Sequence, residues 1–85
     1  MSCYVYVLGC RGGGRMITYV GWTTDLERRL AAHNGGAGGA KTTRGRTWVL
    51  LYAERYEDRR EAMSREWHLK RERAFRKELA GKIVR

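Results

Sequence analysis

Acidic residues, cysteines and long apolar runs are all scarce in this sequence of 85 residues. No apolar run approaches the roughly 18 residues that a membrane-spanning helix needs, so no membrane span is expected. The first ten residues lack the basic start of a signal peptide, and residues 4–8 are more typical of a strand, which favours a cytoplasmic location. Two cysteines, Cys3 and Cys10, are too few for a zinc site. They lie too far apart along one extended strand for a disulfide, so we expect reduced thiols.

The shortage of acids gives the chain a strong positive charge. Eighteen Lys and Arg residues against nine Asp and Glu residues leave a net charge of +9. No acid lies between Glu27 and Glu54, and the same span holds five basic residues: Arg28, Arg29, Lys41, Arg44 and Arg46. Such a field favours polyanions, so we expect a nucleic-acid partner, with acidic proteins and membrane surfaces as less favoured alternatives.

The length predicts a single domain over residues 1–85. Runs of β-branched and aromatic residues predict three strands, at residues 4–8, 16–22 and 47–53. A flexible loop, Gly9–Arg15, joins the first two strands into a hairpin. The first strand is apolar on both faces, which predicts that both faces are covered.

Two helical segments complete the pattern. A capping box at Thr24–Glu27 predicts the start of a helix, and Asn34-Gly35 predicts its end. A second helix, continuous or with a break, is predicted from Glu57–Asp58 to about Leu79, since acids suit the positive end of a helix. The order β-β-α-β-α predicts an α+β domain with a three-stranded antiparallel sheet flanked by helices.

The second helical segment carries charge where apolar residues are expected. Glu66 and Lys70 fall inside a predicted apolar arc that consists of Ala62, Met63, Trp67, Leu69 and Ala74. Burying a carboxylate is costly unless it is paired or binds a metal. An i,i+4 ion pair between Glu66 and Lys70 is the simpler interpretation. A functional carboxylate is the alternative.

The first helix shows a similar anomaly. Leu26 and Leu30 define its core side, and Arg29 and His33 lie on or beside the same stripe. A lone histidine in such a place is usually structural. Two helices that both direct charge toward the sheet, however, favour one polar cleft that accounts for both.

The strands offer matching aromatic groups. Alternation places Tyr4, Tyr6 and Leu8 on one face of the first strand, and Ile17, Tyr19 and Gly21 on one face of the second. Tyr6 and Tyr19 are therefore expected to be neighbours, either as a packing pair or as part of the cleft.

The second glycine-rich segment, from Gly35 to Gly45, does not fit a nucleotide-binding loop. No G-x-x-x-x-G-K-[ST] motif occurs, because Lys41 follows Ala40. Accessible backbone with Lys41, Arg44 and Arg46 suits contact with a nucleic-acid backbone, and a plain flexible loop is the alternative.

In combination, these segments resemble the GIY-YIG nuclease family. The match is carried in order by Tyr4-Val5-Tyr6, Tyr19-Val20-Gly21, Thr24–Leu30, His33-Asn34, Gly39–Arg44, and Glu66 with Lys70. The later segments resemble the short stand-alone bacterial branch, and the nuclease domain of the SLX-type structure-specific endonucleases is similar.

The resemblance implies a role for each of five residues. Tyr6 would be the general base, and Tyr19 would orient the water or the phosphate. Arg29 would bind the scissile phosphate, and His33 would lie beside the nucleophile or the leaving group. Glu66 would be the sole carboxylate ligand of one divalent ion, Mg²⁺ or Mn²⁺.

The resemblance also implies a substrate surface. The predicted nucleic-acid contacts are Lys41, Thr43, Arg44, Arg46 and Lys70. Trp22 is a base-stacking platform or a core residue, and the core interpretation is favoured. The function implied is a metal-dependent endonuclease acting on single-stranded or branched DNA. Its specificity would come from loops, a homodimer or a protein partner. The alternative is a non-catalytic basic nucleic-acid-binding module.

Overall fold

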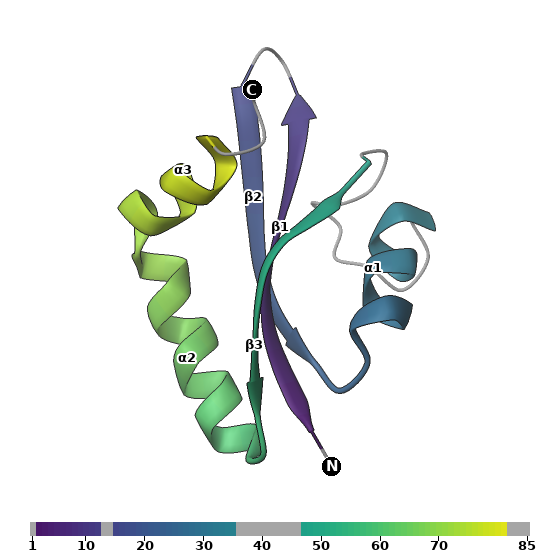
Figure 1. Ribbon diagram of the computed structural model, residues 1–85, viewed down its shortest axis with the longest axis vertical. Coiled ribbons are helices and arrows are strands. Elements are labelled where there is room, and N and C mark those ends of the chain that lie inside the picture. The colour runs from purple at the N-terminus through teal and green to yellow at the C-terminus, as the bar shows by residue number, and fades with distance from the viewer. Residues whose placement is uncertain (1, 13–14, 36–46, 82–85) are drawn as a thin grey trace.

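A computed structural model describes residues 2–12, 15–35 and 47–81. Its elements are β1 (Cys3–Gly12), β2 (Arg15–Thr23), α1 (Leu26–Gly35), β3 (Val49–Tyr56), α2 (Arg59–Arg71) and α3 (Arg73–Gly81). The strands form one antiparallel sheet in the order β2-β1-β3. Helix α1 lies on one face of this sheet, and α2 and α3 lie on the other (Figure 1). The predicted α+β architecture is confirmed. None of the helices in the described part of the chain is long and apolar enough to cross a membrane.

The central strand β1 supplies both halves of the core. Val5 and Val7 are fully buried among the residues that α2 and α3 cover, whereas Tyr6 and Leu8 are buried on the α1 side. Burial of each such aliphatic side chain stabilises the fold by about 1.5–3 kcal/mol. The prediction that β1 is covered on both faces is therefore confirmed. Cys3 and Cys10 are both buried free thiols, as expected.

The first glycine cluster does not form the predicted long loop. Strand β1 continues to Gly12, and β2 already begins at Arg15. Gly9 pairs with Thr18 and Val49 inside the sheet. A Cβ at Gly9 would stand 2.7 Å from Cδ1 of Leu51, so this glycine permits close packing rather than a turn.

Two other boundaries differ from the predicted ones. Strand β3 covers Val49–Tyr56 instead of residues 47–53. Helix α1 is capped by Asp25, whose Oδ1 accepts a hydrogen bond from the Arg28 N–H at 3.1 Å, and not by the predicted Thr24–Glu27 box.

The start of α2 and the break between α2 and α3 are each marked by a capping residue. Asp58 caps α2 by accepting a hydrogen bond from the Arg60 N–H at 2.9 Å. Helix α2 ends at Arg71, and the N–H of the C-cap residue Glu72 bonds to the Leu69 carbonyl. Helix α3 follows at Arg73, so the segment predicted as a second helix is broken into two.

The predicted apolar arc of the second helical segment is partly wrong. Ala62 and Leu69 are buried against the sheet. Met63, Trp67 and Ala74 are exposed. The hydrogen bonds from Arg65 to Glu54 of β3 set the rotation of α2, and this rotation leaves Met63 and Trp67 facing solvent.

Candidate active site

The sheet face beneath α1 is built around Tyr6. Tyr6 in β1 pairs with Gly21 in β2, and its ring lies over this glycine. A Cβ at position 21 would stand 2.5 Å from the Tyr6 hydroxyl and 2.7 Å from its Cζ. Glycine is thus required here because the tyrosine side chain occupies the space that any other residue would fill.

Helix α1 directs His33 at the same tyrosine. The Tyr6 hydroxyl and the His33 Nε2 are 3.0 Å apart, and the histidine side chain is fully buried. Tyr19 joins them, with its ring centroid 4.9 Å from that of His33 and 6.5 Å from that of Tyr6. The predicted neighbourhood of Tyr6, Tyr19 and His33 is present in the structure.

Arg29 sets the electrostatics of this group. Burial raises the pKa of Tyr6 above its usual value, and the Arg29 side chain opposes this effect through a hydrogen bond and its positive charge. Burial also lowers the pKa of His33, and the charge of Arg29 lowers it further. His33 is therefore a neutral imidazole at pH 7. A neutral imidazole that contacts a tyrosine hydroxyl can accept its proton, which gives Tyr6 a path to act as a base.

The end of α1 is fixed by a side-chain bridge to the start of β3. Asn34 donates to the Trp48 carbonyl at 3.1 Å and accepts from the Trp48 N–H. The indole of Trp48 is buried and meets the Tyr19 ring edge-on at 6.2 Å. These contacts hold the C-terminal turn of α1, and with it His33, against the sheet.

Glu66 approaches the site from α2, which lies on the opposite face of the sheet. Its charge contributes to the raised pKa of Tyr6 as the smallest of the five causes. The carboxylate is 22% exposed, and its Oε1 lies 3.9 Å from the Lys70 Nζ. The i,i+4 ion pair that was the simpler interpretation of the sequence is thus present. The carboxylate is partly exposed to solvent, and its negative charge acts on the Tyr6 hydroxyl.

The carboxylate of Glu66 is the candidate ligand that the sequence assigned to a divalent ion. Within residues 2–12, 15–35 and 47–81, no three His, Cys, Asp or Glu side chains gather where they could share an ion. Mg²⁺ commonly keeps several waters and takes one or two protein carboxylates. A single, partly exposed Glu66 carboxylate is compatible with that requirement.

The predicted substrate loop cannot be placed, because Lys41, Thr43, Arg44 and Arg46 lie outside the described residues. Lys70 is exposed, as expected for a nucleic-acid contact. Trp22 packs against the core beneath α2, as the favoured interpretation had it, and the Arg59 guanidinium lies 5.7 Å from the centroid of its ring.

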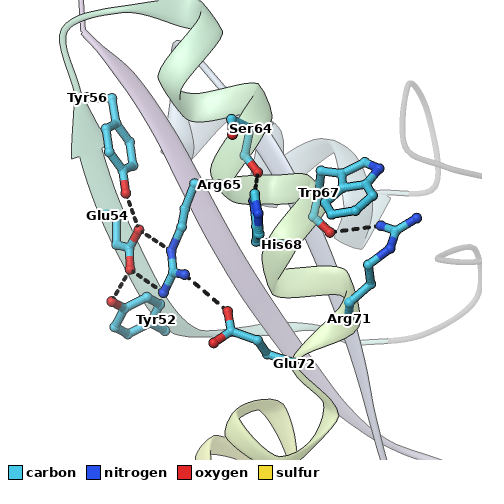
Figure 2. Close-up of polar contacts among 9 residues, drawn as sticks. All are labelled: Tyr52, Glu54, Tyr56, Ser64, Arg65, Trp67, His68, Arg71 and Glu72. Carbon is cyan, nitrogen blue, oxygen red and sulfur yellow. Dashed lines mark hydrogen bonds and ion pairs between the residues drawn. The ribbon is translucent and has the colours of Figure 1, made fainter.

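Sequence reasoning missed a polar network between β3 and α2. Glu54 accepts hydrogen bonds from the hydroxyls of Tyr52 and Tyr56 and from two nitrogens of Arg65, at 2.9 and 3.1 Å (Figure 2). Arg65 also bonds to Glu72 at the break between α2 and α3. The alternation of Tyr52, Glu54 and Tyr56 along one strand face was the available signal.

This network has clear electrostatic consequences. Burial would raise the pKa of Glu54, but the hydrogen bonds from Arg65, Tyr52 and Tyr56 outweigh it and hold that pKa below its usual value. The hydrogen bond to Glu54 raises the pKa of Tyr56 to about 12. Because Arg65 precedes Glu66, the network fixes the rotation of α2 about its axis, and so the direction in which Glu66 points.

Comparison with known proteins agrees with this geometry. The sequence model of the GIY-YIG catalytic domain matches residues 2–78. The chain belongs to the GIY-YIG family. Membership places it among domains of a nuclease family, as the resemblance implied.

Within the GIY-YIG family, the chain belongs with the short stand-alone UPF0213 proteins. It is 51% identical over 69 residues to a UPF0213 protein of Clostridium perfringens, covering 80% of this chain and 70% of that one. It is also 51% identical over 78 residues to one from Streptococcus pneumoniae, covering 91% and 75%. The solution NMR structure of a UPF0213 protein from Bacillus halodurans aligns with a TM-score of 0.54 at 36% identity, covering 98% of this chain and 86% of that chain.

Proposed function

We propose that this GIY-YIG protein is a divalent-metal-dependent endonuclease that hydrolyses phosphodiester bonds in single-stranded or branched DNA. The observation that carries the proposal is the contact between the Tyr6 hydroxyl and the His33 Nε2, 3.0 Å long, in a buried site beside Arg29. This contact gives the tyrosine hydroxyl a proton acceptor within hydrogen-bond reach, which a general base in this position requires.

The proton of the attacking water has a defined route in this proposal. Tyr6 accepts it while passing its own hydroxyl proton to the Nε2 of His33. Protonation of His33 is unfavourable in the free protein because its side chain is buried and because Arg29 lies close by. A bound phosphate offsets the charge of Arg29, so the imidazole becomes a better proton acceptor when substrate is present.

Arg29 and Tyr19 act on the phosphate. The guanidinium binds the non-bridging oxygens and stabilises the negative charge that builds up on them as the water attacks. Tyr19 lies against His33 and directs the water or the phosphate with its hydroxyl.

Glu66 is the residue that would hold the metal. When bound, a Mg²⁺ or Mn²⁺ ion supplies positive charge for the leaving 3′ oxygen. The Glu66 carboxylate would hold the ion, and the exposed Lys70 would contact the DNA backbone.

The test is a nicking assay with Mg²⁺ on a panel of labelled single-stranded, flap, junction and duplex DNAs. We expect Glu66→Gln to abolish cleavage while the affinity for DNA stays within a few-fold of wild type. Tyr6→Phe removes one hydroxyl and should slow single-turnover cleavage by about 10²–10⁴-fold, whereas Tyr19→Phe should cost less.

The controls and the opposing outcome are equally defined. Melting temperatures of all variants establish that they fold. Activity that persists in EDTA, or in Glu66→Gln, would remove the metal from the mechanism. Tight DNA binding with no cleavage of any substrate would leave the chain as a non-catalytic nucleic-acid-binding module.

A further inference from the structure

Helix α2 leaves an aromatic side chain in solvent beside Glu66. Trp67 is 53% exposed, the highest value among the large hydrophobic residues of the described chain. The other tryptophans differ, since Trp48 is buried and Trp22 packs against the core. Trp67, which the sequence placed in the predicted apolar arc of the second helical segment, is therefore the tryptophan most available to a partner among the described residues.

The Trp67 ring is held in place although it is exposed. The Arg71 guanidinium carbon lies 3.5 Å from the ring centroid, and its Nη1 donates to the Trp67 carbonyl at 2.9 Å (Figure 2). The ring of His68 meets the indole at 5.0 Å, at an interplanar angle of 73°. A planar surface that is already fixed loses little conformational entropy when a ligand stacks on it.

The helix places this ring on its solvent-facing surface. Arg59 packs over Trp22 of β2 and Arg65 bonds to Glu54 of β3, which identifies the two sides of α2 that face these strands. At 100° per residue, Glu66 lies on the β2 side with Arg59, and Trp67 lies a further 100° round the helix, beyond Lys70 and away from the buried Ala62 and Leu69.

The surroundings of Trp67 select the chemistry of its partner. Lys70 and Arg71 are one turn away, and the whole chain carries a charge of +9. An apolar protein surface would have to strip water from the Arg71 guanidinium without replacing it. A nucleic-acid strand supplies both a π-face for the indole and a phosphate for the cations.

We propose that Trp67, held by Arg71, is a stacking platform for an unpaired base of the DNA strand that enters the site at Glu66. The location of that strand rests on the function proposed above. In a duplex the base faces are covered by their neighbours, so the platform acts only on single-stranded segments. It gives the protein a preference for DNA that carries an unpaired segment.

Tryptophan fluorescence tests the platform directly, because Trp67 is the exposed fluorophore. Wild-type protein is titrated in EDTA, which prevents cleavage, with an oligothymidylate of about ten nucleotides and with a blunt duplex of equal length. We expect the oligothymidylate to quench the emission, and Trp67→Ala to lose this quenching and to bind single strands about 5- to 150-fold more weakly. Duplex affinity should stay within twofold, and Trp67→Tyr should restore most of the single-strand affinity.

Met63→Ala is the matched control, since Met63 is 47% exposed on the same helix but carries no ring. It should bind as wild type does. Unaltered single-strand affinity in Trp67→Ala, or equal losses for single strand and duplex, would overturn the platform. A concentration-dependent self-association that Trp67→Ala abolishes, without quenching by DNA, would assign the surface to a protein contact and overturn it as well.

The same experiment separates the two proposals. Quenching in EDTA requires no catalysis. If DNA quenches the fluorescence but is never cleaved, the stacking platform stands and the endonuclease proposal is refuted. If cleavage depends on Glu66 but DNA does not quench the tryptophan fluorescence, the endonuclease proposal stands and only the stacking platform is refuted.

Discussion

The steric requirement at Gly21 offers the most direct test of how the site is built. A Cβ introduced by Gly21→Ala would stand 2.5 Å from the Tyr6 hydroxyl, and real Cβ contacts essentially never fall below 3.0 Å. The hydroxyl must therefore retreat by at least the difference, 0.5 Å. The ring has little room to do so, because only 2% of the Tyr6 side chain is exposed.

Two consequences follow from this displacement. Forcing a methyl group into a packed site costs about 1–3 kcal/mol of folding stability. The contact between Tyr6 and His33 is also stretched or re-aimed, and a misplacement of this kind costs on the order of 10²-fold in the rate of the chemical step. We expect Gly21→Ala to fold, to bind DNA, and to cut about 10²-fold more slowly.

Gly9→Ala is a matched control on the other face of the same sheet. Its Cβ would stand 2.7 Å from Cδ1 of Leu51, which is a clash of similar severity in the core beneath α2 and α3. It should lower stability by a similar amount and leave the Tyr6–His33 contact intact, so its cleavage rate should match wild type at temperatures where both are folded.

Urea unfolding gives the stabilities, and single-turnover cleavage gives the rates. The ¹⁵N chemical shifts of the imidazoles give a readout that does not depend on activity. We expect the His33 Nε2 signal to move in Gly21→Ala but not in Gly9→Ala. His68, whose Nδ1 bonds to the Ser64 carbonyl at 2.8 Å, serves as the internal reference. An unchanged His33 signal in Gly21→Ala, or equal inactivation by the two alanines, would refute the reasoning.

Two further predictions concern stability. Arg65→Met removes the guanidinium from a carboxylate that is 19% exposed and should cost about 1–3 kcal/mol by urea unfolding at pH 7, with the exposed Arg60→Met near zero. The pKa of Glu54 is lowered in the folded state, so the ionised carboxylate stabilises the fold above about pH 4.5. This stabilisation is lost as the pH falls through the pKa that Glu54 has in the folded protein. The loss of stability caused by Arg65→Met should therefore become smaller in acid. The lowered pKa of His33 has the same sign: stability should be fully present above pH 6.5 and decrease below it, toward the folded pKa. His33→Gln should flatten this decrease while His68→Gln should not, and equal slopes for wild type and His33→Gln would contradict the burial of a neutral imidazole.

The sequence by itself determined the elements and one face of the site. The alternation of β1 and β2 placed Tyr6 beside Tyr19, and the helical spacing of Arg29 and His33 directed both toward the same sheet. These are local periodicities, set by 2.0 residues per repeat in a strand and 3.6 in a helix. They do not depend on what packs against them, so sequence reading recovered them.

Only the tertiary structure decided whether a glycine forms a turn or a close contact, and whether an apolar side chain is buried or exposed. The sequence predicts a loop at Gly9 and Gly12, yet both residues lie in β1. Position 9 needs a glycine because Leu51 packs where a Cβ would stand, and not because the chain turns there. Whether a glycine serves a turn or a contact depends on atoms far away in the sequence.

The same reason governs α2. Periodicity gave Trp67 to the core and left Glu66 as an anomaly within the apolar arc. The network of Arg65 with Glu54 sets the rotation of the helix instead, and it leaves Trp67 in solvent and Glu66 at the edge of the Tyr6 site. A helix has one intrinsic period but no intrinsic rotation, and that angle is fixed by partners on other elements.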